Sequence, residues 1–353
     1  MSMMWARSVI RSKSALHSRA FGITWVHSEN LIGEEFATLH ATGRADIASA
    51  SILQTLTRTG TFSLIVDGGF DFKTIRNLVA QPGPSATLQS KDELRVFHLG
   101  LRGDYRDPFL GRTYFGLTGY YGVDFWGGSK QDAPQTSFQI TPPGGVTAQG
   151  AGPGKWSKVT GDVARFQSLG LPIIQGLPVL PAILNDSYLI LRATGQYASD
   201  RLLSPERFAI GGYFTVRGYP IAEKIGDHGY AATAEMVVPV PSSAKVPFSS
   251  VTWKELIQVA AFIDHGAVFA SPVSAAPTSQ PQEYLTGAGG GIRINLPFGV
   301  PQPVDRGVLS IKIDWATAIA RPRPSSRDQG LTIHPISGPG DAGVLYVSAA
   351  LRF

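Results

Sequence analysis

The sequence predicts an all-β protein whose strands form a transmembrane antiparallel β-barrel. Apolar and polar residues alternate with a period of two in segments of about 10–14 residues, which Gly, Pro, Ser and Asp separate. Soluble strands usually have about 5–6 residues, whereas a tilted strand of about 9–11 residues spans a bilayer. Hydrophobic residues make up 43% of the chain, and no segment approaches the ~18 consecutive apolar residues of a membrane helix.

The first 24 residues fit no strand pattern. Their basic residues, which include Arg7 and Arg11, are followed by no apolar run of about 7–15 residues, so the segment does not resemble a secretory signal peptide. We leave residues 1–24 unassigned and expect one barrel domain over residues 25–353. About twelve strands are expected in it, at residues 34–50, 51–60, 61–76, 94–107, 112–126, 156–169, 187–200, 228–240, 255–270, 286–296, 308–320 and 343–353.

Four segments rich in Pro, Gly and Ser are expected to be loops and turns between the strands. They are residues 77–93, 127–155, 271–283 and 321–342. No abrupt change in composition divides the chain, and this favours a single domain.

The segment 308–320 shows the alternation most clearly. Leu309 and Ile311 fall on one face, and Lys312 and Asp314 fall on the other. Arg, Asp, Lys and Tyr recur on the polar faces of the neighbouring segments. In a barrel the apolar face turns to lipid, and the polar face lines a water-filled lumen.

The composition argues against several other classes of protein. The chain has no cysteine, which excludes disulfides, thiolate metal sites and cysteine nucleophiles. Its net charge is +5, but the arginines are scattered and form no basic stripe interleaved with aromatic residues. We therefore expect no nucleic-acid partner.

Two segments resemble enzyme motifs, but neither has the context that the motif requires. Ser242 and Lys245 fit the S-x-x-K pattern, but they lie in a Pro-flanked loop without companion motifs. The glycines between Gly287 and Gly291 lack the last glycine of a dinucleotide-binding loop, and no helix follows them. The seven histidines have no metal-ligand spacing. We predict no enzymatic activity, no metal site and no cofactor.

The last residues, GVLYVSAALRF, form an alternating strand that ends in an aromatic residue. The strand is similar to the assembly signal of bacterial outer-membrane barrels. Physically, a barrel closes only when its last strand pairs with its first, because unpaired backbone groups in lipid are costly. The apolar face of this predicted assembly strand comprises Leu345, Val347, Ala349, Leu351 and Phe353.

The most specific signal lies in residues 206–241, ERFAIGGYFTVRGYPIAEKIGDHGYAATAEMVVPVP. This segment resembles the haemolysin secretion/activation family (ShlB/FhaC/HecB type), the two-partner secretion transporters, which belong to the same superfamily as the BamA-type assembly proteins. A pore-loop motif of this superfamily matches Gly211, Gly212, Val216, Arg217, Gly218 and Tyr219. The segment that follows this motif in the family matches Gly226, Asp227, Gly229 and Glu235.

A second motif of the family, F-x-D-x-G, matches Phe262, Asp264 and Gly266. The resemblance implies that a loop at about residues 204–228 folds back into the lumen, and that Arg217 pairs there with Asp264 on the inner wall. Period-two alternation puts Phe262, Asp264 and Gly266 on one face of their strand, so all three can point inward. An arginine in a crowded lumen needs a carboxylate partner to offset its desolvation.

The resemblance covers roughly residues 25–353 and implies a location in the bacterial outer membrane. It implies a channel that exports a large secreted exoprotein of haemolysin or adhesin type, with passenger folding outside as the energy source. The expected partners are this exoprotein, outer-membrane lipid and lipopolysaccharide, and the barrel assembly machinery. A BamA-like factor that inserts other barrels, or a passive porin, is the alternative.

Full-length members of the family carry a signal peptide, a plugging helix and two periplasmic POTRA domains before a barrel of sixteen strands. None of the first three is recognisable in these residues, and about twelve strands are expected. The sequence is therefore interpreted as the barrel region of such a protein, and a fragment, a mispredicted start and a degraded gene are the three explanations that the sequence leaves open.

Overall fold

A computed structural model describes most of the chain. The described residues are 3–7, 19–31, 42–80, 86–130, 154–170, 186–247, 251–269, 271, 283–298, 307–320 and 343–352. Thirteen strands form one antiparallel sheet in which each strand pairs with the next strand of the sheet along the chain. Between the eighth and ninth strands of this sheet, a separate two-stranded hairpin interrupts the sequence.

The strands of the large sheet are long, as the alternation predicts. In sheet order they are β1 (Met3–Arg7), β2 (Arg19–Leu31), β3 (Thr42–Arg58), β4 (Phe62–Ala80), β5 (Ala86–Arg106), β6 (Gly111–Val123), β7 (Trp156–Ser168), β8 (Tyr188–Ala198), β11 (His228–Pro239), β12 (Ile257–Phe269), β13 (Glu283–Phe298), β14 (Gly307–Ala320) and β15 (Val344–Arg352). The hairpin consists of β9 (Phe208–Ile210) and β10 (Lys224–Gly226). A short 3-10 helix, η3 (Ser204–Glu206), precedes the hairpin, and one helical turn, α2 (Trp253–Leu256), precedes β12.

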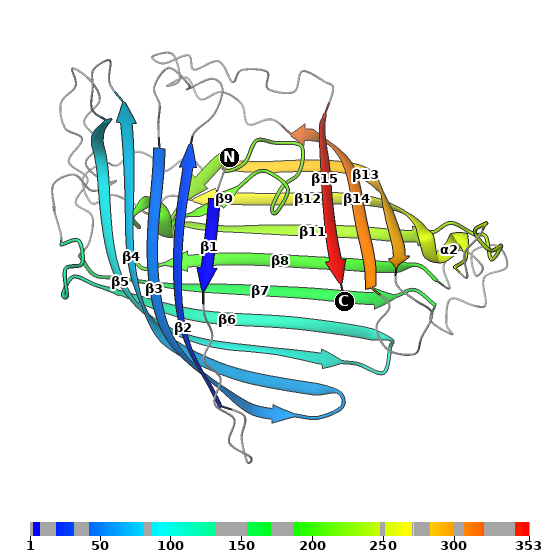
Figure 1. Cartoon of the computed structure of the whole chain (residues 1–353), viewed down its shortest axis with the longest axis horizontal. Helices are drawn as coiled ribbons and strands as arrows, with labels where there is room; N and C mark the ends of the chain where they lie inside the picture. The colour runs from blue at the N-terminus through cyan, green and yellow to red at the C-terminus, as the bar shows by residue number, and fades with distance from the viewer. Residues whose placement is uncertain are drawn as a thin grey trace.

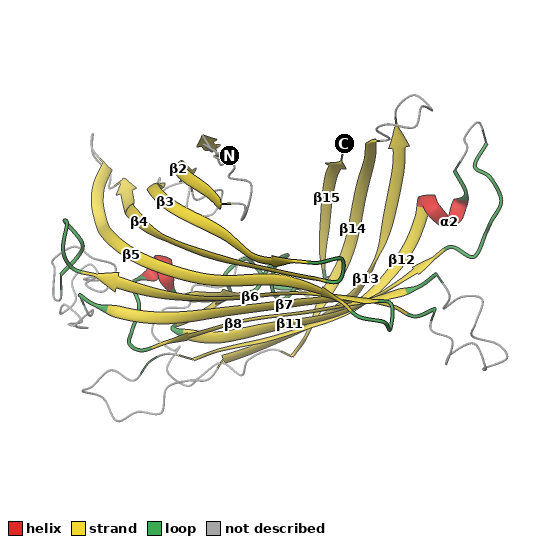
Figure 2. Ribbon diagram, turned by 90° about the horizontal axis from the view of Figure 1, so that it is seen from below, coloured by secondary structure: helices red, strands yellow, loops and turns green. Residues whose placement is uncertain are grey.

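The sheet curves strongly along its whole width. Figures 1 and 2 show a trough, with the N-terminal strands at one edge and β15 at the other, so that both termini lie on the open side. Among the described residues, no hydrogen-bonded register joins β1 or β2 to β15. The segment between β8 and β11 lies within the curve of the sheet (Figure 1).

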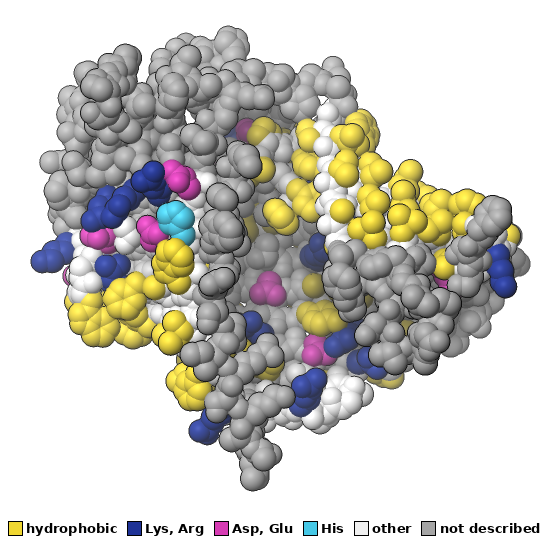
Figure 3. Space-filling model, in the orientation of Figure 1, with side chains coloured by type: hydrophobic (Ala, Val, Ile, Leu, Met, Phe, Trp, Pro, Cys, Tyr) yellow, Lys and Arg dark blue, Asp and Glu magenta, His cyan; other side chains and the backbone are white. Residues whose placement is uncertain are grey.

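The two faces of the sheet differ in chemistry. Large apolar side chains on alternate positions are exposed on the outer face, for example Leu99, Leu117, Leu191, Ile292 and Trp315. The opposite positions carry buried charged groups, and Figure 3 shows charged side chains in the hollow and hydrophobic ones gathered over the β12–β15 side. Such a distribution suits lipid outside and water inside. No helix in the described part of the chain is long and apolar enough to cross a bilayer.

Several boundaries differ from the sequence prediction. The predicted strands 34–50 and 51–60 were wrong as two strands, because Thr42–Arg58 forms the single strand β3, and residues 34–41 lie outside the described residues. The predicted loop at 77–93 was wrong at both ends, since β4 runs to Ala80 and β5 begins at Ala86. A ladder needs only paired backbone groups, so it continues into polar sequence where no apolar face marks it. The remainder of that predicted loop, and most of the other three, lie outside the described residues.

Strands β1 and β2 were not predicted, because residues 1–24 showed no recognised strand pattern. β2 begins at Arg19 and pairs with β3 over its whole length. Its outer positions carry Phe21, Ile23 and Trp25, each at least half exposed. This alternation was the signal in the sequence that could have revealed the strand. The proposed boundary at residue 25 falls within it.

Candidate functional site

The candidate site is the segment 199–227, which we call the luminal loop. It leaves the sheet after β8 and returns at β11. Its hairpin, β9 and β10, forms no ladder with the large sheet and instead lies against the inner wall. Two groups of buried charges hold it there, one at its tip around Arg217 and one at its base around Glu206.

At the tip, Arg217 lies against Asp264 of β12. The guanidinium Nε donates to Asp264 Oδ2 at 2.7 Å and Nη2 donates to Oδ1 at 2.9 Å, while the Arg217 backbone N–H donates to Oδ2 at 3.1 Å. The two residues are 6% and 0% exposed. The planar guanidinium matches a carboxylate at two points, and this fixes orientation as well as charge.

Two further carboxylates and a second arginine complete the tip. Arg217 Nη1 also donates to Glu235 Oε2 of β11 at 3.2 Å and to Asp314 Oδ2 of β14 at 3.3 Å. Arg293 of β13 bridges the same two carboxylates from the wall, through Nη2 to Glu235 Oε1 at 2.8 Å and through Nη1 to Asp314 Oδ1. Two cations thus face three carboxylates, so the wall without Arg217 holds a surplus of two buried negative charges.

The ring of Phe262 packs against Arg217 at the tip. Its ring centroid lies 3.3 Å from Cζ of Arg217, which places the guanidinium over the aromatic face. Burial by itself lowers the pKa of the Arg217 guanidinium, but the hydrogen bonds to Asp264 and the charges of Asp264, Glu235 and Asp314 raise this pKa overall. Arg217 is therefore held as a cation inside the trough.

The backbone at the tip needs glycine. Gly211, Gly212 and Gly218 all have positive φ, and at Gly218 (φ 93°) a Cβ would come 2.7 Å from the Thr317 carbonyl carbon of β14. A Cβ at Gly266 would come 3.0 Å from the Tyr230 carbonyl oxygen and 3.1 Å from Cγ2 of Val216. Glycine therefore allows the loop to lie directly on the wall.

Apolar side chains of the tip pack between these polar contacts. Val216 and Tyr219 are buried in one cluster with Ile210, Ala231, Val268 and Leu285. The Tyr219 hydroxyl donates to the Thr286 carbonyl oxygen at 3.0 Å. The loop also reaches β15, where Gly218 N–H donates to the Tyr346 hydroxyl at 3.1 Å. The tip thus contacts every strand from β11 to β15.

The base is built with the opposite polarity. Glu206, 3% exposed, lies between two wall lysines. Lys73 Nζ of β4 donates to Oε1 at 2.8 Å, and Lys158 Nζ of β7 lies 2.8 Å from Oε2. Burial by itself raises the pKa of Glu206, but the charges and hydrogen bonds of Lys158 and Lys73 lower this pKa overall. Glu206 is therefore held as an anion.

Asp227 fixes the returning end of the loop. It is fully buried, and its Oδ1 accepts from Leu202 N–H at 2.9 Å and from Arg207 Nε at 3.2 Å. Its Oδ2 accepts from Ser271 N–H at 2.8 Å. Gly226 and Gly229 flank this position where the backbone meets Phe269 and the ring of Phe208. Asp227 therefore ties the start of the loop to its end.

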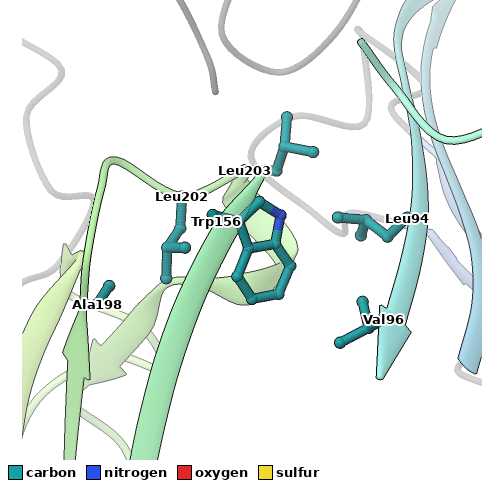
Figure 4. Close-up of a cluster of buried hydrophobic side chains, with 6 residues drawn as sticks. All are labelled: Leu94, Val96, Trp156, Ala198, Leu202 and Leu203. Atoms are coloured by element: carbon teal, nitrogen blue, oxygen red, sulfur yellow. The ribbon is translucent and has the colours of Figure 1, made fainter. Parts of the chain in front are cut away.

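An apolar cluster supports the base. Leu202 and Leu203 of the loop pack with Leu94 and Val96 of β5 and with Trp156 of β7; Ala198 belongs to the same cluster. Figure 4 shows the Trp156 ring between Leu202 and the two β5 side chains. This cluster and the charged groups together join the loop to both halves of the sheet, from β4 to β15.

The residues of the predicted assembly strand do not join this site. Leu345 and Val347 are exposed on the outer face of β15, and Ala349 is exposed on the same face. The side chain of Leu351 and the whole of Phe353 lie outside the described residues. β15 meets the loop through its other face, which carries Tyr346 and Ser348.

Several residues of the site had no signal of their own in the sequence. Arg293 and Asp314 were placed on polar strand faces, but nothing marked them as partners of Arg217. Glu206, Lys73 and Lys158 were not singled out. Among the described residues, no group of His, Asp and Glu is arranged to hold a metal ion. The contacts that the structure gives for the site are ion pairs, hydrogen bonds and apolar packing.

A match to a protein-family model identifies the family of this chain. The description "Haemolysin secretion/activation protein ShlB/FhaC/HecB" matches residues 19–294, which is more than half of the chain. The chain belongs to this family. Members of the ShlB/FhaC/HecB family are two-partner secretion transporters of the bacterial outer membrane and not enzymes. No curated protein matches the sequence.

Solved structures share the fold at low sequence identity. CdiB from Escherichia coli matches with a TM-score of 0.57 and 15% identity, over 95% of this chain and 50% of its own. CdiB from Acinetobacter baumannii matches with a TM-score of 0.53 and 15% identity, over 87% and 45%. BamA from Haemophilus ducreyi lacking POTRA domains 1–3 matches with a TM-score of 0.54 and 11% identity, over 99% and 62%.

These likenesses concern the fold alone. The chain spans about half the length of the solved structures that it matches. The prediction of an all-β outer-membrane barrel with about twelve strands is confirmed.

Proposed function

We propose that this chain forms the wall and the luminal loop of a channel that exports a large secreted protein, of haemolysin or adhesin type, by two-partner secretion. The observation that carries the proposal is the bidentate pair between Arg217 and Asp264, which seats the loop tip on the inner wall. A loop held in this way narrows the lumen at a defined place. A passive porin has no need of such a device.

The outer face supports a position in lipid. Exposed Leu345, Val347 and Ile319 form an apolar surface on the last two strands, and Ile23 and Trp25 do the same on β2. We infer that outer-membrane lipid and lipopolysaccharide are the partners of this face. We also propose that the barrel assembly machinery engages the β15 strand, because its outer positions alternate as an outer-membrane assembly signal requires.

The proposal is tested in the bacterium that carries the gene. Deletion of the gene is expected to remove one large protein from the culture supernatant, and the wild-type gene is expected to restore it. Complementation with Arg217→Ala or Asp264→Ala should leave secretion strongly reduced. The level of folded barrel in outer membranes, measured in parallel, should fall much less, because most sheet hydrogen bonds do not involve the loop.

A matched control separates loop docking from the loss of any ion pair. Arg102 lies on the inner face of β5 and pairs with Asp67 at 2.7 Å, but it does not touch the loop. Arg102→Ala should secrete as the wild type does. Full secretion by both Arg217→Ala and Asp264→Ala would refute the role of the pair.

The same deletion distinguishes the alternatives. A BamA-like insertion factor would deplete many barrels from the outer membrane rather than one protein from the supernatant. A passive porin would change the uptake of small solutes and leave both protein fractions intact. Either result would replace the export proposal.

A further inference from the structure

The luminal loop exposes several apolar side chains, and Phe214 is the most exposed of them. Phe214 is 92% exposed, the largest value for a large hydrophobic residue in the described part of the chain. Its neighbours Ile210 and Val216 are fully buried. An exposed phenylalanine ring is unfavourable in a water-filled trough, because burial of an aromatic ring is strongly favourable. Phe214 is thus placed where something else could cover it.

The backbone under Phe214 is fixed. The Thr215 hydroxyl accepts from Gly211 N–H at 2.9 Å and donates to the Gly211 carbonyl oxygen at 3.0 Å, which closes a tight turn. Tyr213 is tied to β15 through Ser348, with 3.1 Å between the two hydroxyl oxygens. The Tyr213 ring meets the Phe214 ring edge-on at 5.3 Å. These hydrogen bonds and the contact with Tyr213 therefore fix the backbone at Phe214 and the position of its ring.

Phe214 borders a cavity of about 490 Å³ on the inner face. The wall of this cavity is polar, and it includes Asp162 of β7, Arg192 of β8 and Lys312 of β14. These three side chains form no ion pair with one another or with any other described residue. Their charges have both signs, which does not suit a purely anionic ligand such as a phosphate or a nucleic acid.

An extended polypeptide fits this combination. Its backbone carries donors and acceptors that need water or polar partners, and a wall with charges of both signs supplies them. Its apolar side chains need a contact that tolerates many sequences, and an exposed aromatic ring supplies that. We propose that Phe214 is a contact site for the exported polypeptide in transit, opposite a polar wall that includes Asp162, Arg192 and Lys312. This inference rests on the proposed export function.

A photo-cross-linking amino acid tests the contact directly. It is placed at position 214 and, as a control, at position 221 of the full chain in exporting cells. Ile221 belongs to the same loop and is 84% exposed, but it does not border the cavity. Cross-links to the secreted protein are expected at position 214 and not at position 221. Equal labelling at both positions, or none at position 214 while export proceeds, would overturn the contact site and leave the export function standing. If the wild type exports no protein, both proposals fall together.

Substitution measures how much the contact matters. Phe214→Ala should lower the rate of export by about fivefold to tenfold, as expected for truncation of an aromatic contact residue. Phe214→Trp should retain most of the export, and Ile221→Ala should be neutral. The amount of folded barrel, followed by its heat-sensitive migration in electrophoresis, should be the same in all three. Unchanged export by Phe214→Ala at equal barrel levels would contradict the proposal.

Discussion

The two ends of the luminal loop are attached to the wall with opposite polarity. At the tip the loop supplies the cation, Arg217, and three strands supply carboxylates, Asp264, Glu235 and Asp314. At the base the loop supplies the anion, Glu206, and two strands supply lysines, Lys73 and Lys158. Both groups are buried, so each unpaired charge would carry a large desolvation cost.

This difference fixes the orientation of the loop. A loop docked the other way round would bring Glu206 to the wall carboxylates and Arg217 to the wall lysines, and both contacts would repel. Opposite polarity at two separated points therefore selects one arrangement of the loop on the wall. Like-charge rejection of wrong pairings is a common source of specificity in charged interfaces. The two ends also differ in strength, because the tip arginine makes five hydrogen bonds to carboxylates and packs on Phe262.

The largest effect is expected for Arg217→Ala. This change leaves Asp264 without its partner and leaves Arg293 alone between Glu235 and Asp314. Breaking a buried pair from one side costs about 3–5 kcal/mol. Urea unfolding of the barrel refolded in detergent micelles measures the loss of free energy of unfolding.

Arg217→Lys separates charge from shape. A lysine retains the charge but cannot meet Asp264 at two points. We expect it to recover part of the stability, with the loop more accessible to protease than in the wild type. A fully stable Arg217→Ala variant would show that the tip does not hold the loop.

The tip and the base also differ in what the sequence reveals. Arg217 and Asp264 lie in local motifs, so a resemblance was enough to predict their pairing. Glu206 and Lys73 are 133 residues apart. Glu206 begins the matched segment 206–241 and Lys73 lies in a predicted strand, but nothing in the sequence marks the two as partners. Lys73 and Lys158 lie in the predicted strands 61–76 and 156–169, but alternation cannot say which strand faces which loop residue. That information depends on the curvature of the whole sheet, which no local pattern contains.

The second-largest effect is expected for Glu206→Gln. This change removes the charge between Lys73 and Lys158 and leaves two buried cations near one another. We expect a loss of about 2–4 kcal/mol in the free energy of unfolding, less than for Arg217→Ala because the apolar cluster around Leu202 and Trp156 remains. Protease cleavage within residues 199–210 should increase while the tip stays protected. Cleavage at the tip first would contradict two independent attachments.

Acidification should act at the base through the same carboxylate. The pKa of Glu206 is lower in the folded protein than its usual value of about 4.3, so its contribution to stability is fully present above that value. The contribution is lost as the pH falls toward the lowered pKa in the folded state, because protons then bind preferentially to the unfolded chain. The difference in stability between wild type and Glu206→Gln should therefore shrink as the pH is lowered from 6 to 3. A difference that stays constant over this pH range would show that Glu206 is not the source of the pH dependence of stability.

The smallest effects are expected for the two lysines, and they are expected to be unequal. Lys158 contacts Glu206 Oε2, the Glu206 carbonyl oxygen at 2.9 Å and Gln196 Oε1 at 3.2 Å. Among the described residues, the ammonium group of Lys73 meets only the carboxylate of Glu206 and, more distantly, that of Asp71. Lys158→Met should cost about 1–2 kcal/mol and Lys73→Met about 1 kcal/mol or less, because Glu206 keeps one lysine in each case. The free energy of unfolding, measured as for Arg217→Ala, checks both values. If the two losses are equal, the base depends on the carboxylate alone, and only the tip combines several directed bonds.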